Sequence, residues 1–189
     1  MRLAKLGRWV VVSLILTAVG CGGDGSPDQT RSGTIQMSNA RRIVVEAEDI
    51  EAGSIELPMV LEHHPDASGG RCLSVPGGAG KPGYGAGAGK EVFGKAVYSV
   101  DIPSSGDYVF HGRAFWMNGC GNSFKLVIDQ SRAQAFSDQL YDKWHWVRGP
   151  TFELSAGTHH ITILNREDGV KLDQFLLTTD TGYRPVGPE

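Results

Sequence analysis

Cysteine is scarce in this sequence, and apolar residues never extend into a long uninterrupted run. The 189-residue chain contains only 3 cysteines. Beyond the amino-terminal segment, no stretch approaches the ~20 consecutive apolar residues that a transmembrane helix needs. No segment shows a helical period over three turns, and no internal repeat is evident. These absences argue against a membrane-spanning bundle, a helical domain and a repeat architecture.

Positive charge is also in short supply. The chain has 18 lysines and arginines against 21 aspartates and glutamates. Three of the basic residues and none of the acidic ones fall within residues 1–20, so the remainder carries 15 against 21, a formal charge of −6. A mildly acidic surface argues against nucleic acid or anionic lipid as the partner.

The amino terminus has the pattern of an export signal. Three basic residues precede an apolar run over residues 9–19, which is too short to span a bilayer but suits a secretory signal. Residues 18–21 read Ala-Val-Gly-Cys and resemble the bacterial lipobox, although the usual leucine is Ala18 here. We therefore predict a lipoprotein signal peptide over residues 1–20, with Cys21 acylated and the protein anchored at a periplasmic face or the cell surface. An ordinary signal peptide cut nearby is the alternative.

Composition then divides the rest of the chain. Residues 21–40 are rich in Gly, Ser, Asp and Thr and poor in apolar side chains, which predicts a flexible tether. A globular domain is expected over residues 41–181, followed by a short tail over residues 182–189. Export leaves Cys72 and Cys120 as an even pair in an oxidising compartment, where a disulfide between them is the default expectation.

The globular segment has the spacing of strands and turn residues that is typical of an all-β protein. Short runs of β-branched and aromatic residues, several of them alternating apolar with polar, are broken by Gly, Pro, Ser and Asp. This spacing predicts a β-sandwich or barrel. The expected strands cover residues 42–48, 96–102, 108–115, 122–129, 158–164 and 169–178. A glycine-rich stretch over residues 76–90 lacks the Lys-Ser/Thr ending of a phosphate-binding loop and is interpreted as a sandwich loop.

Three carboxylates have a pattern that could hold a cation. Glu46 and Glu48 stand two apart on the first strand and project from the same face. Asp173 shares a face of the last strand with Phe175 and Leu177, so it requires a polar partner. Three such oxygen donors would suit calcium. The alternative, which spacing alone favours, is that the glutamates are solvated and Asp173 accepts backbone N–H groups.

Four motifs in matching order resemble family 6 and family 35 carbohydrate-binding modules. Residues 45–49 (Val-Glu-Ala-Glu-Asp) are similar to the Glu-Ala-Glu opening of those families, and residues 94–108 to their paired strands around a Pro-x-x-Gly-x-Tyr turn. Residues 154–159 match a Leu-x-x-Gly-x-His step, and residues 172–175 a closing Leu-Asp-x-aromatic strand. The resemblance covers residues 42–180.

This resemblance implies a galactose-binding-like β-sandwich jelly roll without catalytic activity. It also implies a structural calcium ion held by Glu46, Glu48 and Asp173. The family's ligand cleft lies in loops at one edge, where aromatic rings stack on sugars beside an amide. The matching residues here would be Trp116, Asn118 and, on the glycine-rich loop, Tyr84.

One position departs from the family pattern. Lys171 stands where an asparagine often contacts the ligand, which could favour an acidic sugar through Lys171 or Arg166. The alternative is that residues 168–169 form a plain hairpin turn with solvated charges.

Other aromatic and titratable residues give weaker signals. Trp144 and Trp146 lie on one side of a strand, a pattern more typical of core or sheet packing than of a sugar platform. The histidine pairs at 63–64 and 159–160 lack a third ligand at fixed spacing. No Ser-His-Asp order with a nucleophile elbow appears. Four carboxylates near loops keep a catalytic pair possible: Glu62, Asp66, Asp138 and Asp142.

The leading hypothesis is a non-catalytic lipoprotein that binds a polysaccharide or oligosaccharide and touches the membrane only through its lipid anchor. A structural or adhesive lipoprotein that binds protein is the second hypothesis. A small jelly-roll hydrolase or lyase is the third.

Overall fold

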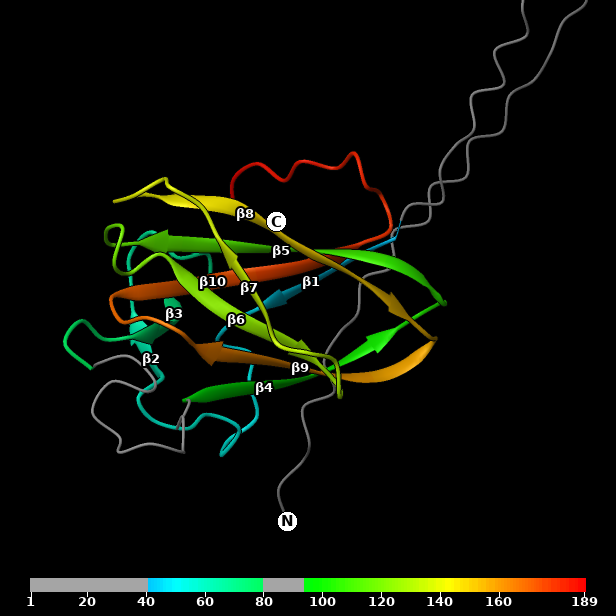
Figure 1. The fold of residues 1–189 in the computed structure, drawn as a ribbon, viewed down its shortest axis with the longest axis horizontal. Coiled ribbons are helices and arrows are strands. Elements are labelled where there is room, and N and C mark those ends of the chain that lie inside the picture. Colours follow the sequence, from blue (N-terminus) through cyan, green and yellow to red (C-terminus); the bar gives the residue numbers. More distant parts are fainter. Residues whose placement is uncertain (1–40, 80–93) are drawn as a thin grey trace, which may run out of the picture. The chain divides into compact units, whose positions relative to one another are not determined.

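Two antiparallel β-sheets make up the part of the chain that the computed structural model describes, residues 41–79 and 94–189 (Figure 1). The chain divides into two units, residues 1–36 and 37–189, and the described residues belong to the second. The predicted signal peptide, Cys21, the tether and Tyr84 lie outside the described residues.

Strands account for all the regular secondary structure in these ranges, so the all-β prediction is confirmed. No helix there is long and apolar enough to cross a membrane. The strands are β1 (Arg42–Glu46), β2 (Val60–His63), β3 (Arg71–Val75), β4 (Lys95–Ile102), β5 (Gly106–Trp116), β6 (Ser123–Ile128), β7 (Gln134–Ser137), β8 (Trp144–Leu154), β9 (Gly157–Asn165) and β10 (Val170–Thr178).

The strand order brings the two ends of the domain together. One sheet runs β2-β3-β10-β5-β8, with β1 also paired to β10, and the other runs β4-β9-β6-β7 (Figure 1). In the β1–β10 pair, Glu46 lies opposite Gln174. The carboxylates near the two ends of the domain therefore meet at one place in the sheet.

Alternation along the strands decides which side chains enter the core between the sheets. On β4, Ala96, Tyr98, Val100 and Ile102 are buried, because alternate residues of a strand point to the same face. On β5 the inward set includes Phe110, Ala114 and Trp116. The residues between them, such as Arg113 and Phe115, therefore lie on the outer face of the six-stranded sheet.

An irregularity in β10 sets the position of Asp173. The pairing of β10 with β5 shifts register between Leu172 and Gln174, which leaves Asp173 without a cross-strand partner on β5. Such a bulge re-aims one side chain while the flanking residues keep their faces. Asp173 is completely buried, and Leu172 and Phe175 still pack in the core.

Candidate functional site

The three predicted carboxylates form one cluster. Glu46 ends β1, Glu48 lies in the turn that follows, and Asp173 occupies the bulge of β10. One oxygen from each of them lies within 4.8 Å of an oxygen from the others. Backbone pairing holds this arrangement, since Ala47 N–H donates to the Asp173 carbonyl at 2.8 Å.

Several donors surround two of these carboxylates. The Ser68 N–H donates to Asp173 Oδ1 at 2.8 Å, and its hydroxyl bonds both Asp173 and Glu46. The Arg113 guanidinium forms a buried ion pair with Asp173. Gln174 Nε2 donates to Glu46 Oε1 at 2.6 Å. Both carboxylates are therefore tied to the protein and oriented.

Glu48 is different, because its Oε2 atom is buried and has no hydrogen-bond donor within the described chain. Burial raises the pKa of Glu48, and the negative charges of Glu46, Asp173 and Asp49 raise it further, against a backbone hydrogen bond that lowers it. A Cβ atom on Gly69 would lie 1.6 Å from Glu48 Oε1, so a larger residue there would force the Glu48 carboxylate to move. A buried acceptor without a donor is the kind of group that a cation satisfies.

The donor set fits a hard divalent cation. Calcium binds carboxylate oxygens at about 2.3–2.6 Å, so oxygens on opposite sides of an ion are roughly 5 Å apart, in keeping with the observed spread of 4.8 Å. Arg113 already balances one of the three negative charges. A bound cation would balance the other two.

Trp116 is not a sugar platform, which corrects the sequence prediction. Its side chain is 0% exposed and packs against Phe124 and Phe136, with ring centroids 5.8 and 6.2 Å away. Its indole nitrogen donates to Asp138 Oδ1 at 3.0 Å. The physical reason is alternation along β5, which turns Trp116 to the same side as the core residue Ala114.

The other members of the predicted loop-edge site have different surroundings. Asn118 is exposed, and its Oδ1 accepts the Cys120 N–H at 2.8 Å within the turn after β5. Lys171 lies on β10 and forms an ion pair with Glu62. Tyr84 falls outside the described residues. Among the described residues, the loop edge thus keeps the Asn118 amide but loses the Trp116 ring.

The predicted Cys72–Cys120 disulfide is also wrong, because both cysteines are free thiols. Val170 pairs with both Val75 and Trp116, so the carboxyl ends of β3 and β5 lie at the same edge. Cys72 is three residues back from that edge, roughly 10 Å along the strand, while Cys120 lies in the turn beyond it. A disulfide requires Cα atoms within about 7 Å.

An aromatic cluster on the outer face of the six-stranded sheet was missed from sequence. Trp144, Phe115 and His64 are each partly exposed, with ring centroids between 5.1 and 5.9 Å apart. The Arg113 guanidinium lies 5.2 Å from the Trp144 ring centroid. The period of two was the available signal. It puts Arg113 and Phe115 on the same face of one strand, and Trp144 and Trp146 on the same face of another.

An ion pair and a second tryptophan lie next to this cluster. Lys171, paired with Glu62, lies directly opposite Phe115 across the β10–β5 pair. Trp146 follows Trp144 on the same face of β8, and its Nε1 donates to the Gly187 carbonyl at 2.6 Å. The tryptophan pair, interpreted from sequence as packing, therefore lies on the outer face and is only partly buried.

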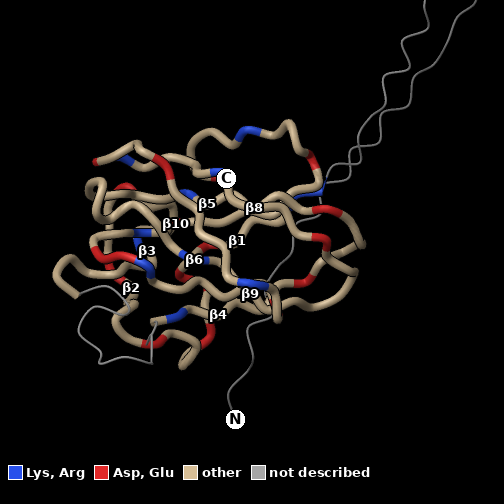
Figure 2. The backbone as a smooth tube through the Cα atoms, in the orientation of Figure 1, with Lys and Arg blue, Asp and Glu red and all other residues tan. Residues whose placement is uncertain are grey.

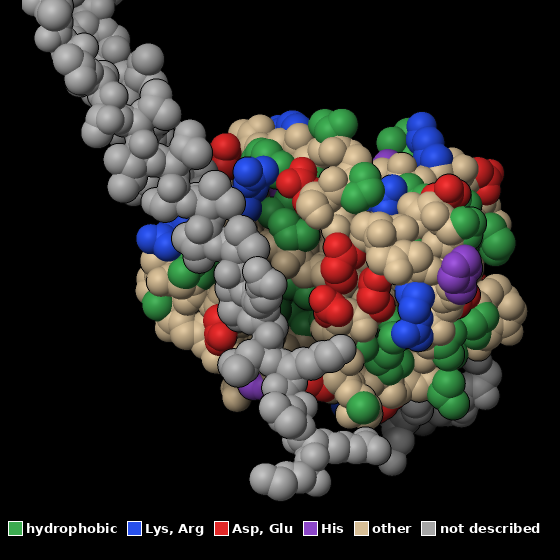
Figure 3. All heavy atoms as spheres, turned by 180° about the vertical axis from the view of Figure 1, so that it is seen from behind, with side chains coloured by type: hydrophobic (Ala, Val, Ile, Leu, Met, Phe, Trp, Pro, Cys, Tyr) green, Lys and Arg blue, Asp and Glu red, His purple; other side chains and the backbone are tan. Residues whose placement is uncertain are grey.

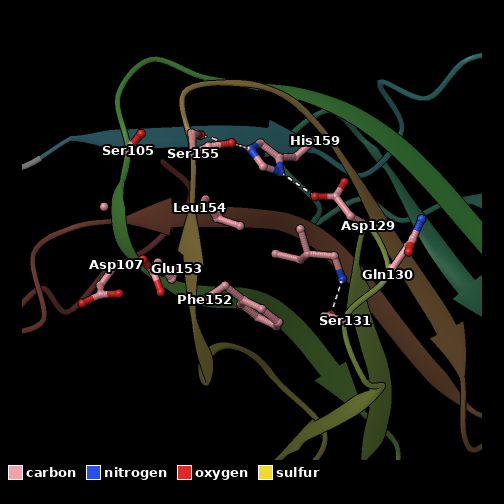
Figure 4. Close-up of a pocket in the computed structure, with 12 residues that line it drawn as sticks. Ser105, Asp107, Asp129, Gln130, Ser131, Phe152, Glu153, Leu154, Ser155 and His159 are labelled. Carbon is pink, nitrogen blue, oxygen red and sulfur yellow. Dashed lines mark hydrogen bonds and ion pairs between the residues drawn. The ribbon is translucent and has the colours of Figure 1, made fainter.

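A second region of interest is a pocket of about 810 Å³ lined by three turns (Figure 4). His159 lies between two partners there, with Nδ1 2.6 Å from Asp129 Oδ2 and Nε2 3.3 Å from Ser155 Oγ. Nε2 also lies 3.0 Å from the Ser155 carbonyl oxygen. Sequence reasoning missed this Ser-His-Asp chain because Asp129 follows β6, whereas Ser155 and His159 lie at the β8–β9 turn about 30 residues later.

The imidazole of His159 ties two turns together. Asp129 Oδ1 also accepts the His160 N–H at 2.8 Å. Burial alone raises the pKa of Asp129, but the hydrogen bonds from His160 and His159 outweigh it, and the resulting pKa is below the ordinary value. Because the Ser155 carbonyl is nearer to Nε2 than the hydroxyl is, the geometry favours a clamp between turns over an activated serine.

Charge is unevenly distributed over the surface. Charged positions occur on both sheets and in the connecting loops (Figure 2). On the face opposite to that of Figure 1, acidic side chains gather near the centre with a basic side chain beside them (Figure 3). This local excess of negative charge agrees with the acidic composition of the chain.

Comparison with known proteins identifies the fold. No protein-family model matches the chain, and no curated protein matches it. A family 35 carbohydrate-binding module from Clostridium thermocellum is 18% identical, with a TM-score of 0.50 over 71% of this chain and 97% of the module. A carbohydrate-binding module of Cellvibrio mixtus lichenase 5A, solved with cellotriose, is 19% identical, with a TM-score of 0.51 over 74% and 97%.

A larger enzyme contains a similar domain. The structure of a Podospora anserina β-(1,4)-mannanase with a family 35 module is 16% identical, with a TM-score of 0.55 over 76% of this chain. The chain spans only 29% of that enzyme's length. These likenesses show that the described domain has the β-sandwich jelly-roll fold of family 6 and family 35 modules, as the sequence predicted.

Proposed function

We propose that this protein is a non-catalytic glycan-binding module whose binding surface is the outer face of the six-stranded sheet around Trp144. The observation that carries the proposal is the partly exposed cluster of Trp144, Phe115 and His64, bordered by the Lys171–Glu62 pair. Modules with the same fold, including one solved with cellotriose, are named for carbohydrate binding.

The chemistry of the cluster suits a sugar. The C–H face of a sugar ring stacks on an aromatic ring, and a few polar groups fix its hydroxyls. Lys171 supplies a donor and Glu62 an acceptor at the edge of the aromatic surface. Trp144 is held by the Arg113 guanidinium and by a 3.4 Å hydrogen bond from its Nε1 to His64. A pre-oriented ring loses less entropy on binding, although one platform supports only roughly 10 μM to 1 mM affinity.

A glycan array with the exported chain, made with Cys21→Ser, tests this proposal. Trp144→Ala should abolish retention on the glycans that bind the parent protein, while the unfolding temperature changes little. Asn118→Ala is the matched control, because it changes the loop edge and not the outer face. This variant should still bind the glycans that bind the parent protein. If Asn118→Ala abolishes binding and Trp144→Ala does not, the ligand binds at the loop edge and the outer-face site is misplaced.

Calcium is the second part of the proposal. Glu46, Glu48 and Asp173 would hold the ion, and its role would be to stabilise the junction of β1 and β10. The buried, donor-free Glu48 oxygen supports this assignment. The cluster lies beside the ion pair of Asp173 with Arg113, which in turn supports Trp144. Ion binding would therefore also steady the proposed glycan surface.

Anchoring is the third part and rests on the amino-terminal sequence. Lipid attachment to Cys21 would place the module at a membrane surface on a short tether. Cys21→Ala should move the protein from the membrane fraction to the soluble fraction of cells that express the full chain. Retention of the variant in the membrane fraction would refute the lipoprotein assignment.

Hydrolysis is the competing function, and the Ser155–His159–Asp129 chain is the observation that favours it. A serine hydrolase would transfer the Ser155 hydroxyl proton to His159 as Oγ attacks a carbonyl carbon. A fluorophosphonate probe reports such a nucleophile directly. We expect no labelling of Ser155 in the native protein; labelling that Ser155→Ala abolishes would establish the hydrolase instead.

A further inference from the structure

Two arginines converge on the same backbone oxygen at the outer face of the six-stranded sheet. Arg148, on β8, donates to the Thr181 carbonyl at 3.0 Å, and Arg184 donates to the same oxygen at 3.3 Å. Arg184 also bonds the Tyr183 carbonyl at 2.8 Å. Both arginines are exposed. Within the described residues, both arginines thus donate to neutral carbonyl oxygens.

A buried histidine lies against this pair. His111 is directly opposite Arg148 across the β5–β8 pair, and His111 is only 2% exposed. Its Nε2 atom is buried and has no hydrogen-bond partner among the described residues. Burial in the first place, together with the charges of Arg148 and Arg184, lowers the pKa of His111 to about 4.

These groups together lack a negative partner. Elsewhere in the described ranges, Arg42, Arg113 and Arg166 each form an ion pair with a carboxylate, but Arg148 and Arg184 do not. A buried polar nitrogen without a partner is unfavourable, and guanidinium groups bind oxyanions more strongly than neutral carbonyls. An oxyanion placed at the arginines would offer acceptors to both and would offset the positive potential at His111.

We propose that Arg148 and Arg184, beside His111, form a site for an oxyanion carried by a glycan, either a sulfate ester or a carboxylate. The location supports a glycan source: Arg148 follows Trp146 by two residues, so it continues the row that Trp144 and Trp146 form on the outer face of β8. The inference rests on the proposed function, because it places a charged subsite at one end of the proposed sugar surface.

The tail after β10 takes part in this site. Residues 179–189 follow β10 to the carboxyl terminus (Figure 1). They include Thr181 and Arg184, and the Gly187 carbonyl accepts a hydrogen bond from Trp146. The tail therefore supplies one of the two cations and the neutral oxygen that the oxyanion would replace. Because an oxyanion adds a direct charge–charge attraction and can accept two parallel N–H bonds from a guanidinium, this exchange favours the ligand.

Isothermal titration of the exported chain with Cys21→Ser tests the site with defined probes. Dextran sulfate and polygalacturonate supply the two oxyanions on a glycan, uncharged dextran removes the charge, and sodium sulfate is the free anion. We expect one or both charged polymers to bind. Arg148→Gln and Arg184→Gln should each weaken that binding about tenfold. Arg132→Gln, an exposed arginine in the turn after β6, makes the same change in charge and should alter it less than twofold.

The nitrogen resonance of His111 Nε2 supplies a local readout on the same samples. It should shift on addition of the bound polymer, and the shift should disappear in Arg148→Gln. Equal weakening by Arg132→Gln would mean unspecific attraction and would overturn the site. Binding of sodium sulfate as tight as that of the polymers would overturn the glycan source. If no charged probe binds but array glycans still bind through Trp144, the oxyanion site is wrong and the proposed function stands.

Discussion

The indole nitrogen of Trp116 donates a hydrogen bond to Asp138 Oδ1 at 3.0 Å, from a ring that is otherwise enclosed by the core. The same carboxylate oxygen accepts from His145 Nε2 at 2.9 Å and from the Leu140 N–H at 3.0 Å. Asp138 thereby joins the end of β5 to the loop between β7 and β8. Trp116 is a structural residue at the base of the loop edge.

Replacement of Trp116 should therefore act on stability. Trp116→Ala removes a large core side chain and leaves a cavity, which should lower the free energy of unfolding by about 3–5 kcal/mol. Urea denaturation measures this loss. Leu57→Ala, at an exposed apolar position, is the control and should change stability by no more than about 0.5 kcal/mol. A normally stable Trp116→Ala protein would contradict the buried position.

Calcium removal should destabilise the protein. A metal that binds only the folded state raises stability by mass action, so a chelator should lower the unfolding temperature of the parent protein. Glu48→Gln keeps the size of the side chain, removes its charge and should make the chelator effect much smaller. The measurement is calorimetry with and without excess calcium. An unfolding temperature that chelator leaves unchanged would remove calcium from the proposal.

The raised pKa of Glu48 predicts a pH dependence in chelator. A carboxyl whose pKa is higher in the folded than in the unfolded state stabilises the fold below its ordinary pKa, near 4.5, and loses that contribution as pH rises through the raised value. Relative to Glu48→Gln, the calcium-free parent protein should therefore lose stability as pH rises above about 4.5. Saturating calcium should abolish the difference, since the ion favours the charged carboxylate. The same difference with and without calcium would argue against ion binding at Glu48.

His111 predicts the opposite trend in the acid range. Its pKa is lowered to about 4, whereas an ordinary histidine titrates near 6.5. Between these values the unfolded chain binds more protons, so stability should fall as pH decreases from about 6.5 to 4, by at most roughly 3 kcal/mol. Comparison with His111→Gln isolates this contribution from that of the carboxylates. Parallel stability curves for the two proteins would show that His111 has an ordinary pKa.

The two cysteines of the domain should differ in reactivity. Cys120 is exposed, whereas Cys72 is buried and its pKa is raised to about 12, first by burial and then by the nearby charge of Glu62. Because thiolates are the reactive species, a thiol reagent should modify one cysteine quickly in native Cys21→Ser protein and a second only after unfolding. Cys120→Ser should lose the fast reaction. Mass spectrometry that finds no reactive thiol in the native, unreduced protein would restore the disulfide.

Local pattern was sufficient for the architecture and for one cluster. Apolar and polar residues alternate over strand-length segments that are separated by turn residues. Because the side chains of a strand repeat with a period of two, this pattern indicates a β-sandwich. The same period predicted that Glu46 and Glu48 share a face of the first strand. In the structure β1 ends at Glu46 and Glu48 lies in the turn that follows, although the two carboxylates do belong to one cluster. Their meeting with Asp173 was predicted through the family resemblance, and the pairing of β1 with β10 brings it about.

Alternation could not tell which of the two faces of a strand is covered. Trp116 and Phe115 are adjacent on β5, and only the packing of the second sheet decided that Trp116 is buried and Phe115 partly exposed. The contacts of Trp144 with His64 and of Arg148 with Thr181 likewise join residues far apart in sequence. Strand order and register fix such neighbours, and a single sequence carries no local signal for them. The sequence by itself thus determined the sheet-forming pattern and the acidic pair, whereas the tertiary structure decided which aromatic and basic residues share a surface.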